Sequence, residues 1–412
     1  MGEILNVTRG ASLSGEFYAT EGEYIRLTCG NFDYQNNCFK ENKSKDNLYY
    51  VGDFRSEFLM EEGDIITPLT EQAIGLLGST AIIPESGKYI QSQDVAKIVC
   101  KEDLLDKNFA FYLISSTLVK QQLSAAAQQT KIRHTSPDKI KDCTVWIPEL
   151  SEQKRIGKLL RSIDSKIELN RQINQNLEAM AKQLYDYWFV QFDFPNEEGK
   201  PYKSSGGNMV WNEKLKRNIP IGWNNGTLID IANITMGQSP DGTSYNEIGE
   251  GVLFYQGSTD FGMRFPSVRQ YTTAPSRFAK KGDILMSVRA PVGAVNIANN
   301  DCCIGRGLSA LNSKIGSTTH LYYILNDLRI AFDQRNAAGT TFGSITKEDL
   351  YNLPIVIPAK EVISAFDKIC SPMFDRQMLL GEEIDTLIKQ RDELLPLLLN
   401  GQVLVNSDLS AH

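Results

Sequence analysis

The sequence predicts an α+β (mixed α/β) fold in which two similar domains are separated by two long antiparallel helices that form a coiled coil. Three observations carry this prediction. The sequence repeats itself at a spacing of some 210 to 230 residues, short β-branched runs alternate with turn residues inside each copy, and a long amphipathic stripe follows each copy. The expected segments are a first domain at 1–150, a first helix at 151–194, a second domain at 195–358 and a second helix at 359–405.

The repeat is marked by three pairs of matching segments. Residues 63–66 (GDII) match 282–285 (GDIL), residues 7–10 (VTRG) match 234–237 (ITMG), and Ile147-Pro148 lies 210 residues before Ile357-Pro358. Because this period is far longer than the roughly 20 to 45 residues of a solenoid repeat, it indicates a duplicated unit of one domain and one helix.

Inside each copy, short β-branched runs end at Gly, Pro and Asn turns, for example at 290–293. A helix is expected at 109–123 in the first copy and at 319–334 in the second. Between the copies, residues 194–201 and 204–208 are polar and rich in Gly, Pro and Ser, which indicates a linker.

The first long helix is expected to have Ser151 as its N-cap and to continue from Glu152 to Tyr187, about 36 residues or roughly 54 Å. One apolar row recurs in steps of seven and is interrupted by Asn170; its members are Ile156, Ile163, Leu177 and Leu184. A second row is interrupted by Lys166; its members are Leu159, Ile173, Met180 and Tyr187. Such rows are typical of a coiled-coil seam, in which polar residues can fix the register.

The second long helix repeats this pattern. Its first row consists of Phe366, Met373, Leu380, Leu387 and Leu394, and its second row contains Ile363, Ile369 and Leu397. Two such helices at equivalent places of a duplicated chain indicate an antiparallel pair that acts as a spacer. Because proline removes a backbone hydrogen bond, we expect a break at Pro372, with Ser371 capping the renewed helix.

Aromatic residues crowd the end of the first helix: Tyr185, Tyr187, Trp188, Phe189, Phe192 and Phe194. They can pack against the neighbouring domain, which we favour, or form a site for a partner protein.

The charge balance is acidic, with a net charge of −7 and a pI near 5.3, which argues against a simple nucleic-acid binder. The charge is unevenly distributed: residues 196–358 carry 16 Lys and Arg against 14 Asp and Glu, and residues 1–150 carry 15 against 21. Any DNA-binding surface must therefore be a local patch, and a partner protein is expected to contribute to DNA affinity.

Motifs for catalysis are missing. The chain has neither the glycine-rich cofactor loop and Asn/Asp-Pro-Pro-aromatic motif of a methyltransferase nor a G-x-x-x-x-G-K-[ST] phosphate loop. Its seven cysteines show no C-x-x-C spacing, so we expect free thiols, no metal site and no cofactor. No apolar run is long enough to span a bilayer, and we expect a cytoplasmic protein. An enzyme with an unrecognised site is the least supported alternative.

Several stretches resemble the DNA specificity subunits of type I restriction-modification systems. In the second domain they are residues 284–293 (ILMSVRAPVG), 303–308, 339–345 and 352–358, and in the helical regions they are residues 168–174, 188–189 and 394–401. The similarity covers nearly the whole chain, is strong from Ser151 onward and is weaker over 1–130. The order and duplication of these stretches, rather than any one of them, carry the resemblance.

This resemblance implies two target-recognition domains, each reading one half of a bipartite site on double-stranded DNA, and two helices that set the gap between the half-sites. It also implies a non-catalytic subunit whose helices bind methyltransferase (modification) subunits, with restriction subunits joining through the complex. S-adenosylmethionine, ATP and Mg²⁺ are implied to belong to those partners. The alternative, favoured by the acidic balance, is a coiled-coil scaffold that does not bind DNA.

For contact with DNA we expect basic and polar residues in loops beside strands, because arginine pairs with guanine or with phosphates. The candidates of the second domain are Arg264, Arg269, Arg277, Arg289 and Arg306, with Gln238 and Thr341 as uncharged partners. The candidates of the first domain are Lys40, Lys43, Lys45 and Arg55.

The first domain departs from the family pattern. Residues 67–73 align with 287–293 but lack the arginine, and no residues match 219–223 (IPIGW) at the start of the first copy. Different half-site sequences and a shortened first domain both explain this departure.

Overall fold

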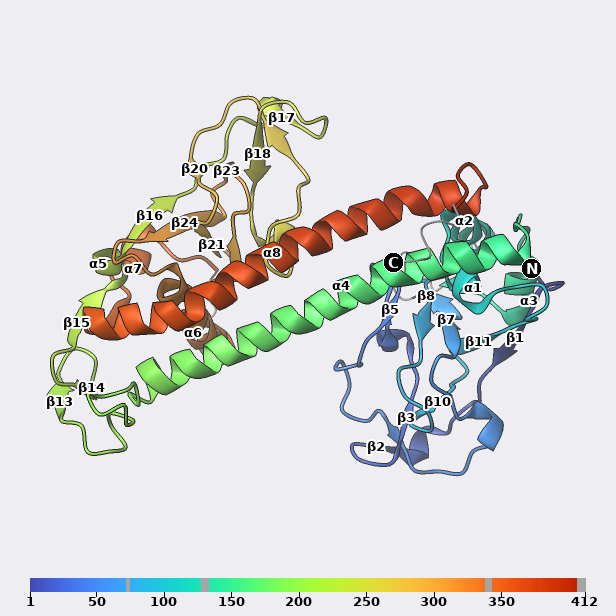
Figure 1. Ribbon diagram of the computed structural model, residues 1–412, viewed down its shortest axis with the longest axis horizontal. Coiled ribbons are helices and arrows are strands. Elements are labelled where there is room, and N and C mark those ends of the chain that lie inside the picture. The colour runs from blue at the N-terminus through green and yellow to red at the C-terminus, as the bar shows by residue number, and fades with distance from the viewer. Residues whose placement is uncertain (72–74, 127–132, 338–342, 406–412) are drawn as a thin grey trace. The chain divides into compact units, whose positions relative to one another are not determined.

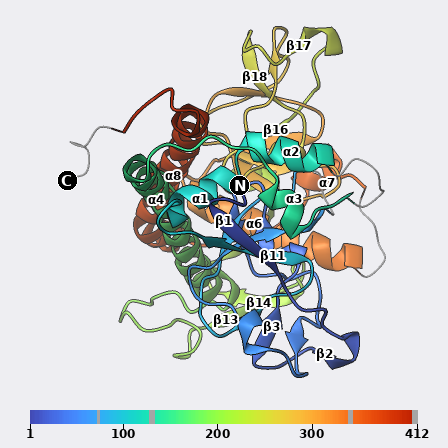
Figure 2. The same ribbon diagram turned by 90° about the vertical axis from the view of Figure 1, so that its right-hand side faces the viewer.

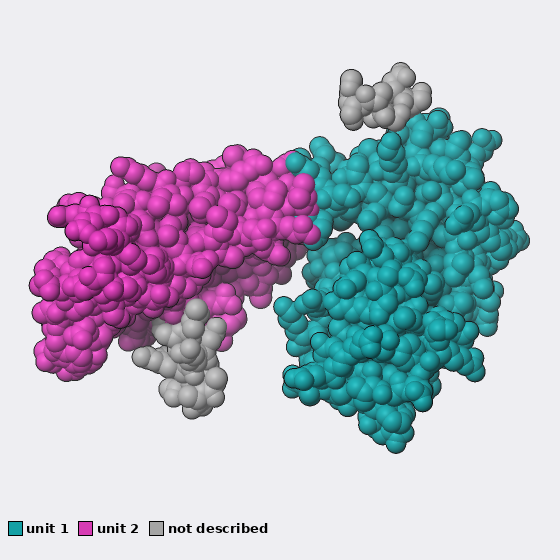
Figure 3. Space-filling view, turned by 60° about the horizontal axis from the view of Figure 1, so that its bottom comes forward, with its two compact units in different colours: residues 1–168, 385–412 teal, residues 169–384 magenta. Residues whose placement is uncertain are grey.

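The computed structural model describes residues 1–71, 75–126, 133–337 and 343–405, without the side chains of 133 and 330–337 (Figures 1 and 2). The chain divides into two compact units, one of Met1–Glu168 with Asp385–His412 and one of Leu169–Ile384 (Figure 3). Each unit contains one copy of the sequence repeat and one part of each long helix.

The first unit is built on a four-stranded antiparallel sheet. Its strands lie in the order β1 (Leu5–Arg9), β11 (Val95–Cys100), β7 (Ile65–Pro68) and β9 (Ala81–Ile82). A smaller sheet has the order β10 (Tyr89–Ile90), β3 (Tyr24–Arg26), β6 (Tyr49–Tyr50) and β2 (Tyr18–Ala19). The remaining strands pair as β4 (Phe32–Asp33) with β5 (Cys38–Phe39) and β8 (Thr70–Glu71) with β12 (Arg133–His134). The short helices are α1 (Lys107–Ile114), α2 (Thr117–Ala126), α3 (Pro137–Lys141), η1 (Gly15–Phe17), η2 (Cys29–Asn31) and η3 (Ser56–Phe58).

The second unit has a matching four-stranded sheet. Its strands lie in the order β16 (Ala232–Met236), β24 (Leu308–Ser313), β21 (Ile284–Ser287) and β22 (Val295–Ile297). A five-stranded sheet has the order β17 (Tyr245–Asn246), β19 (Tyr271–Thr272), β18 (Val252–Tyr255), β23 (Cys302–Ile304) and β20 (Phe278–Ala279). Two further pairs are β13 (Met209–Asn212) with β14 (Arg217–Pro220) and β15 (Asn224–Thr227) with β25 (Pro354–Ile357). The helices are α5 (Leu228–Ile231), α6 (Thr318–Ala337), α7 (Lys347–Tyr351), η4 (Asp186–Val190), η5 (Gly242–Ser244) and η6 (Ser258–Asp260).

The two copies share one topology. The sheet β1-β11-β7-β9 corresponds to β16-β24-β21-β22, with every pair antiparallel in both units. The parallel pair β3–β10 corresponds to the parallel pair β18–β23. The predicted duplication of one mixed α/β domain is therefore confirmed.

Two long helices, α4 (Leu150–Tyr185) and α8 (Lys360–Leu399), lie side by side within each unit (Figures 1 and 2). In the first unit Arg391 pairs with Asp164 at 3.0 Å, and in the second unit Asn170 donates to Glu383 at 2.9 Å. Residue numbers rise along one helix as they fall along the other, so the pair is antiparallel, as predicted.

The first row of each predicted seam is buried or partly buried. Ile156, Phe366 and Leu380 are fully buried, and the partly buried members are Ile163, Leu177, Leu184, Met373, Leu387 and Leu394. The second row is wrong by one position, except at Ile363, which is buried as predicted. Its buried members are Leu160, Ile167, Asn174 and Ala181 in α4 and Cys370, Gln377, Ile384 and Leu398 in α8. Of the residues predicted for it, Ile173 is only partly buried, whereas Met180 and Ile369 are 54% and 43% exposed.

Two predictions about helix ends are also wrong. Helix α4 begins at Leu150, where the amides of Glu152 and Gln153 donate to the Glu149 carbonyl, so Ser151 lies inside the first turn. Helix α8 continues through Pro372 without a break. Pro372 is exposed between the buried Cys370 and Phe374, so water can hydrate the carbonyl that proline leaves unbonded while the buried neighbours hold the helix.

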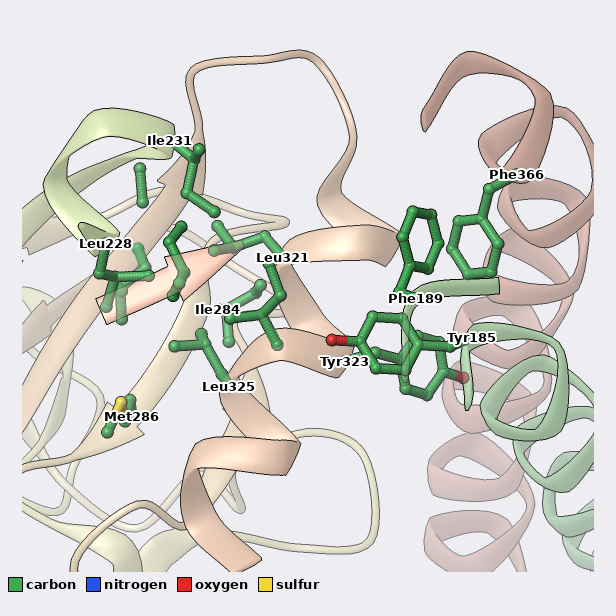
Figure 4. Packing of buried hydrophobic residues seen from close by; sticks show 14 of the residues in the cluster. Tyr185, Phe189, Leu228, Ile231, Ile284, Met286, Leu321, Tyr323, Leu325 and Phe366 are labelled. Carbon is green, nitrogen blue, oxygen red and sulfur yellow. The ribbon is translucent and has the colours of Figure 1, made fainter. Parts of the chain in front are cut away.

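The aromatic residues at the end of α4 enter the core of the second unit, as favoured, except Tyr187, which is 36% exposed. Figure 4 shows Tyr185 and Phe189 beside Phe366 of α8 and Tyr323 of α6. The Phe189 and Phe366 rings are 5.0 Å apart and the Tyr185 and Tyr323 rings 5.5 Å apart. The same core includes Trp188, Phe192, Phe194 and Trp223, so the second domain is packed onto both long helices.

Candidate DNA interface

Three backbone segments of the second domain approach one another at glycines. A Cβ on Gly237 would lie 2.1 Å from the Gly305 carbonyl oxygen, and a Cβ on Gly307 would lie 2.6 Å from that of Gln256. Only glycine permits this approach. We call Gly237, Gly305 and Gly307 the glycine junction.

The junction brings three predicted DNA-contacting residues together from separate segments. The Gln238 amide donates to the Ile304 carbonyl at 3.0 Å, and the Ile304 amide donates to the Arg277 carbonyl at 2.9 Å. The Arg306 amide donates to Ser239 Oγ at 3.2 Å. The side chains of Gln238, Arg277 and Arg306 are all exposed.

Arg289 joins the same surface. The amide of its neighbour Val288 donates to the Gly307 carbonyl at 2.9 Å, and Arg289 is exposed. Among the described residues, no ion pair engages Arg277, Arg289 or Arg306, so these guanidinium groups are available to phosphates or to guanine. Thr341 lies outside the described residues.

Gln256 was not among the sequence candidates. Its side chain is exposed, and its carbonyl oxygen lies against Gly307, which places it on the junction. The only sequence signal was the Gln256-Gly257 step directly after a strand-like run.

The other two arginine candidates differ from this group. Arg264 is only 8% exposed, pairs with Glu178 of α4 at 3.0 Å and lies over the rings of Tyr322 and Phe374. The expectation of an exposed arginine in a DNA-facing loop is wrong at Arg264. Arg269 is 62% exposed and pairs with the buried carboxylate of Asp260 at 2.9 Å.

The first domain has an equivalent junction at Gly10, where a Cβ would lie 2.2 Å from the Gln91 carbonyl oxygen. Matching backbone bonds give the correspondence between the two domains. In the first domain the Ala11 amide donates to the Gln91 carbonyl, Gln91 to Phe58, and Leu69 to Asp94. In the second domain the equivalent bonds run from Gln238 to Ile304, from Ile304 to Arg277, and from Val288 to Gly307. In the first domain, the positions equivalent to Gln238, Arg277, Arg289 and Arg306 are therefore occupied by Ala11, Phe58, Thr70 and Gln93, in that order. The cations of the second junction are absent at these four positions.

Cations of the first domain come from a different segment. Lys40, Lys43 and Lys45 are exposed on the loop between β5 and β6. Asn42 fixes this loop by donating to Thr28 Oγ1 at 2.9 Å. Arg55 lies apart from it, before η3, is 80% exposed and pairs with Glu57.

The lysine loop is linked to the first junction through η2. The neighbouring Cys29 thiol donates to the Thr70 carbonyl at 3.4 Å, and burial raises the pKa of Cys29 to about 11, which keeps the thiol protonated as a donor. The basic side chains thus lie on a loop attached to the junction rather than on the junction itself.

Comparison with known proteins assigns the family. The model of the type I restriction modification DNA specificity domain matches residues 1–179 and 220–371. The chain belongs to this family. As a type I restriction-modification specificity protein it acts in DNA target recognition, and the two matched segments contain the two junctions.

Relatives agree with this assignment. The chain is 29% identical over 379 residues to the putative type I restriction enzyme MjaX specificity subunit of Methanocaldococcus jannaschii, covering 87% of this chain and 84% of that protein. It is 23% identical to the type I restriction enzyme HindI specificity subunit of Haemophilus influenzae, covering 77% and 81%. The fold is similar to the crystal structure of the type I restriction-modification system S subunit from M. genitalium, with a TM-score of 0.60, 16% identity and coverage of 97% and 94%.

The described residues contain no group of three or more His, Cys, Asp or Glu side chains suited to hold a metal ion. None of their helices combines the length and apolar character that a membrane span requires. None of the seven cysteines, all of which lie within the described residues, forms a disulfide bond.

Proposed function

We propose that the chain is the DNA-reading subunit of a type I restriction-modification complex and that its two domains read the two halves of an asymmetric bipartite site. The observation that carries this proposal is the pair of equivalent junctions with different side chains. One offers Arg277, Arg289 and Arg306. The other offers the exposed Gln93, with lysines on an adjacent loop. Duplication supplies two similar readers, and divergence at the junctions makes the two half-sites different.

The helices α4 and α8 set the number of unread base pairs between the half-sites, and they dock the methyltransferase subunits. A continuous helix of 36 residues is roughly 54 Å long, which exceeds the 34 to 36 Å of about one DNA turn. Because the net charge is −7, partner subunits add phosphate contacts that this chain lacks. Restriction subunits join through the assembled complex.

Catalysis belongs to the partners in this proposal. S-adenosylmethionine, ATP and Mg²⁺ are bound by the methyltransferase and restriction subunits, and this chain contributes target choice. No step of methyl transfer or cleavage is assigned to its residues.

The test is to co-express the chain with its methyltransferase partner and to sequence the methylated sites. We expect one asymmetric motif with two half-sites and a fixed gap. Replacing Arg306 or Arg277 by Ala should reduce discrimination at one half-site only, by about 1–3 kcal/mol per lost bidentate contact. The matched control is Lys216→Ala, whose exposed side chain pairs with Glu213. Methylation without sequence preference, unchanged by these variants, would favour the coiled-coil scaffold instead.

A further inference from the structure

Two carboxylates on α4, Asp164 and Glu178, lie 14 residues apart, which is two heptads and therefore one face of the coiled coil. Each one bonds both to its own recognition domain and to α8. In the first unit, Asp164 accepts from Tyr112 Oη of α1 at 2.5 Å and from Arg391 of α8 at 3.0 Å. We call Tyr112, Asp164 and Arg391 the first clamp.

The second unit repeats this arrangement with other residues. Glu178 accepts from Arg264 of the recognition domain and from Gln377 Nε2 of α8, each at 3.0 Å. Arg264 is held further by the rings of Tyr322 on α6 and Phe374 on α8, at 5.0 and 4.5 Å. We call Arg264, Glu178 and Gln377 the second clamp. It joins the loop after η6 to both long helices and to α6.

Stability alone does not explain the second clamp. Gln377 is 2% exposed, and its Oε1 has no hydrogen-bond partner among the described residues. Nε and one terminal nitrogen of Arg264 are also buried without a partner there. Buried, incompletely paired polar groups cost free energy that apolar residues of the same size would avoid. Such a cluster instead fixes the orientation of the recognition domain on the long helices. An ion pair with hydrogen bonds allows one orientation, whereas apolar contacts leave the orientation adjustable.

Orientation matters for the gap because DNA is helical. With about 10 to 10.5 base pairs per turn, one added base pair rotates the second half-site by roughly 35° and moves it by about 3.4 Å. A domain that is free to tilt on the helices can follow such a change. A domain held in one orientation cannot.

We infer that the two clamps make the protein selective for one gap length, by holding each recognition domain in a single orientation on the helix pair. This inference rests on the proposed function and deepens it. In this scheme the junctions recognise the sequence of each half-site, and the clamps determine which gap length is accepted. Arg264, a candidate for DNA contact by sequence, becomes a positioning residue that acts through Glu178.

The experiment uses the complex with its methyltransferase partner and a DNA library that keeps both half-sites and varies the gap by one or two base pairs. The variants are Arg264→Met, which keeps the apolar stem between the two rings, and Glu178→Gln, which keeps size and hydrogen bonding without the charge. The matched control is Lys281→Met, which removes an exposed ion pair between the same domain and Glu382 of α8.

We expect each clamp variant to lower the ratio of methylation at the native gap to methylation at a gap one base pair longer or shorter by about tenfold, within the usual range of coupling between sites. Base preferences within the half-sites should be unchanged, and Lys281→Met should behave as the wild type. An unchanged ratio in both variants, or an equal loss at every gap length, overturns the inference. If the wild type itself shows no bipartite site, it is the proposed function that fails.

Discussion

At the scale of single residues, two arginines of the same domain differ in burial, and the difference has an electrostatic reason. Arg264 has lost most of its contact with water and is stabilised by Glu178 and two aromatic rings. Arg306 is exposed at the glycine junction, and among the described residues only its backbone amide is engaged, by Ser239. A hydrated cation without a partner can exchange water for a phosphate or a guanine, whereas a buried ion pair cannot be separated without a large desolvation cost.

The junction depends on the absence of a side chain at Gly237. Because a Cβ there would meet the Gly305 carbonyl at 2.1 Å, Gly237→Ala is expected to push the two segments apart and to destabilise the fold by about 1–3 kcal/mol. Methylation at the second half-site should fall with it. Gly242→Ala is the matched control, because its Cβ would meet nothing within 4 Å. Equal urea midpoints for the two variants would contradict the close approach.

The buried His320 leads to a prediction about how the stability of the fold depends on pH. Burial lowers the pKa of His320 to about 4, and the charge of Asp367 only partly opposes this shift. Since the folded pKa lies below the unfolded value of 6.5, the unfolded chain takes up the proton first as the pH falls. This contribution to stability is complete above pH 6.5 and is lost as the pH falls toward 4, by roughly 3 kcal/mol.

The measurement is the free energy of unfolding in urea between about pH 7 and pH 4.5, for the wild type and His320→Gln. The variant can be less stable throughout, because the His320 ring packs 4.5 Å from that of Phe189. Its pH dependence should nevertheless be weaker by about the amount given above. Parallel curves for the two proteins would show that His320 does not titrate between these pH values.

At the scale of elements, the long helices show which side chains a heptad pattern can and cannot place. Positions i+3 and i+4 both lie near the face of residue i, so one apolar row leaves two options for its companion row. The buried row contains Asn174 in α4 and Gln377 in α8, whereas the exposed neighbouring row contains apolar Met180 and Ile369. The apolar pattern therefore pointed one residue away from the true seam.

The seam can be tested with two adjacent leucines of α8. Leu380 is fully buried and Leu379 is 58% exposed, so the same substitution should have different effects. Leu380→Ala is expected to cost about 2–5 kcal/mol of stability, because it removes buried contacts and leaves a cavity. Leu379→Ala should remain within about 0.5 kcal/mol of the wild type. Urea denaturation of the two variants decides the point, and similar midpoints would contradict the assigned seam.

At the scale of the whole chain, duplication provides the common plan and the long helices connect its two copies. Each unit has one domain, one clamp and a part of both helices. If the helices determine the gap, their length and the DNA rise together fix the number of unread base pairs.

Adding one heptad to α4 and one to α8 at matching positions, in the Arg264→Met background that lets the second domain turn with the DNA, is therefore expected to lengthen the gap. Seven residues add about 10.5 Å of helix, close to three base pairs at about 3.4 Å each. Both half-site sequences should be retained, as read from the methylated sites. A heptad in α4 alone is the control, since it separates the clamps from their partners on α8 and should abolish methylation at the native site. An unchanged gap in the double insertion would mean that the helices do not set it.

The sequence by itself determined the duplication, the mixed α/β fold, the antiparallel helix pair and the first row of its seam, because each follows from the regular spacing of residues along the chain. Among the candidates for DNA contact that the sequence named are Arg277, Arg289 and Arg306, which are exposed in the structure. Only the tertiary structure decided that these three lie together with Gln256, that Pro372 stays within a helix, and that Arg264 is buried. Glu178 is 86 residues from Arg264 in the chain, and burial depends on such distant partners, which local patterns do not encode.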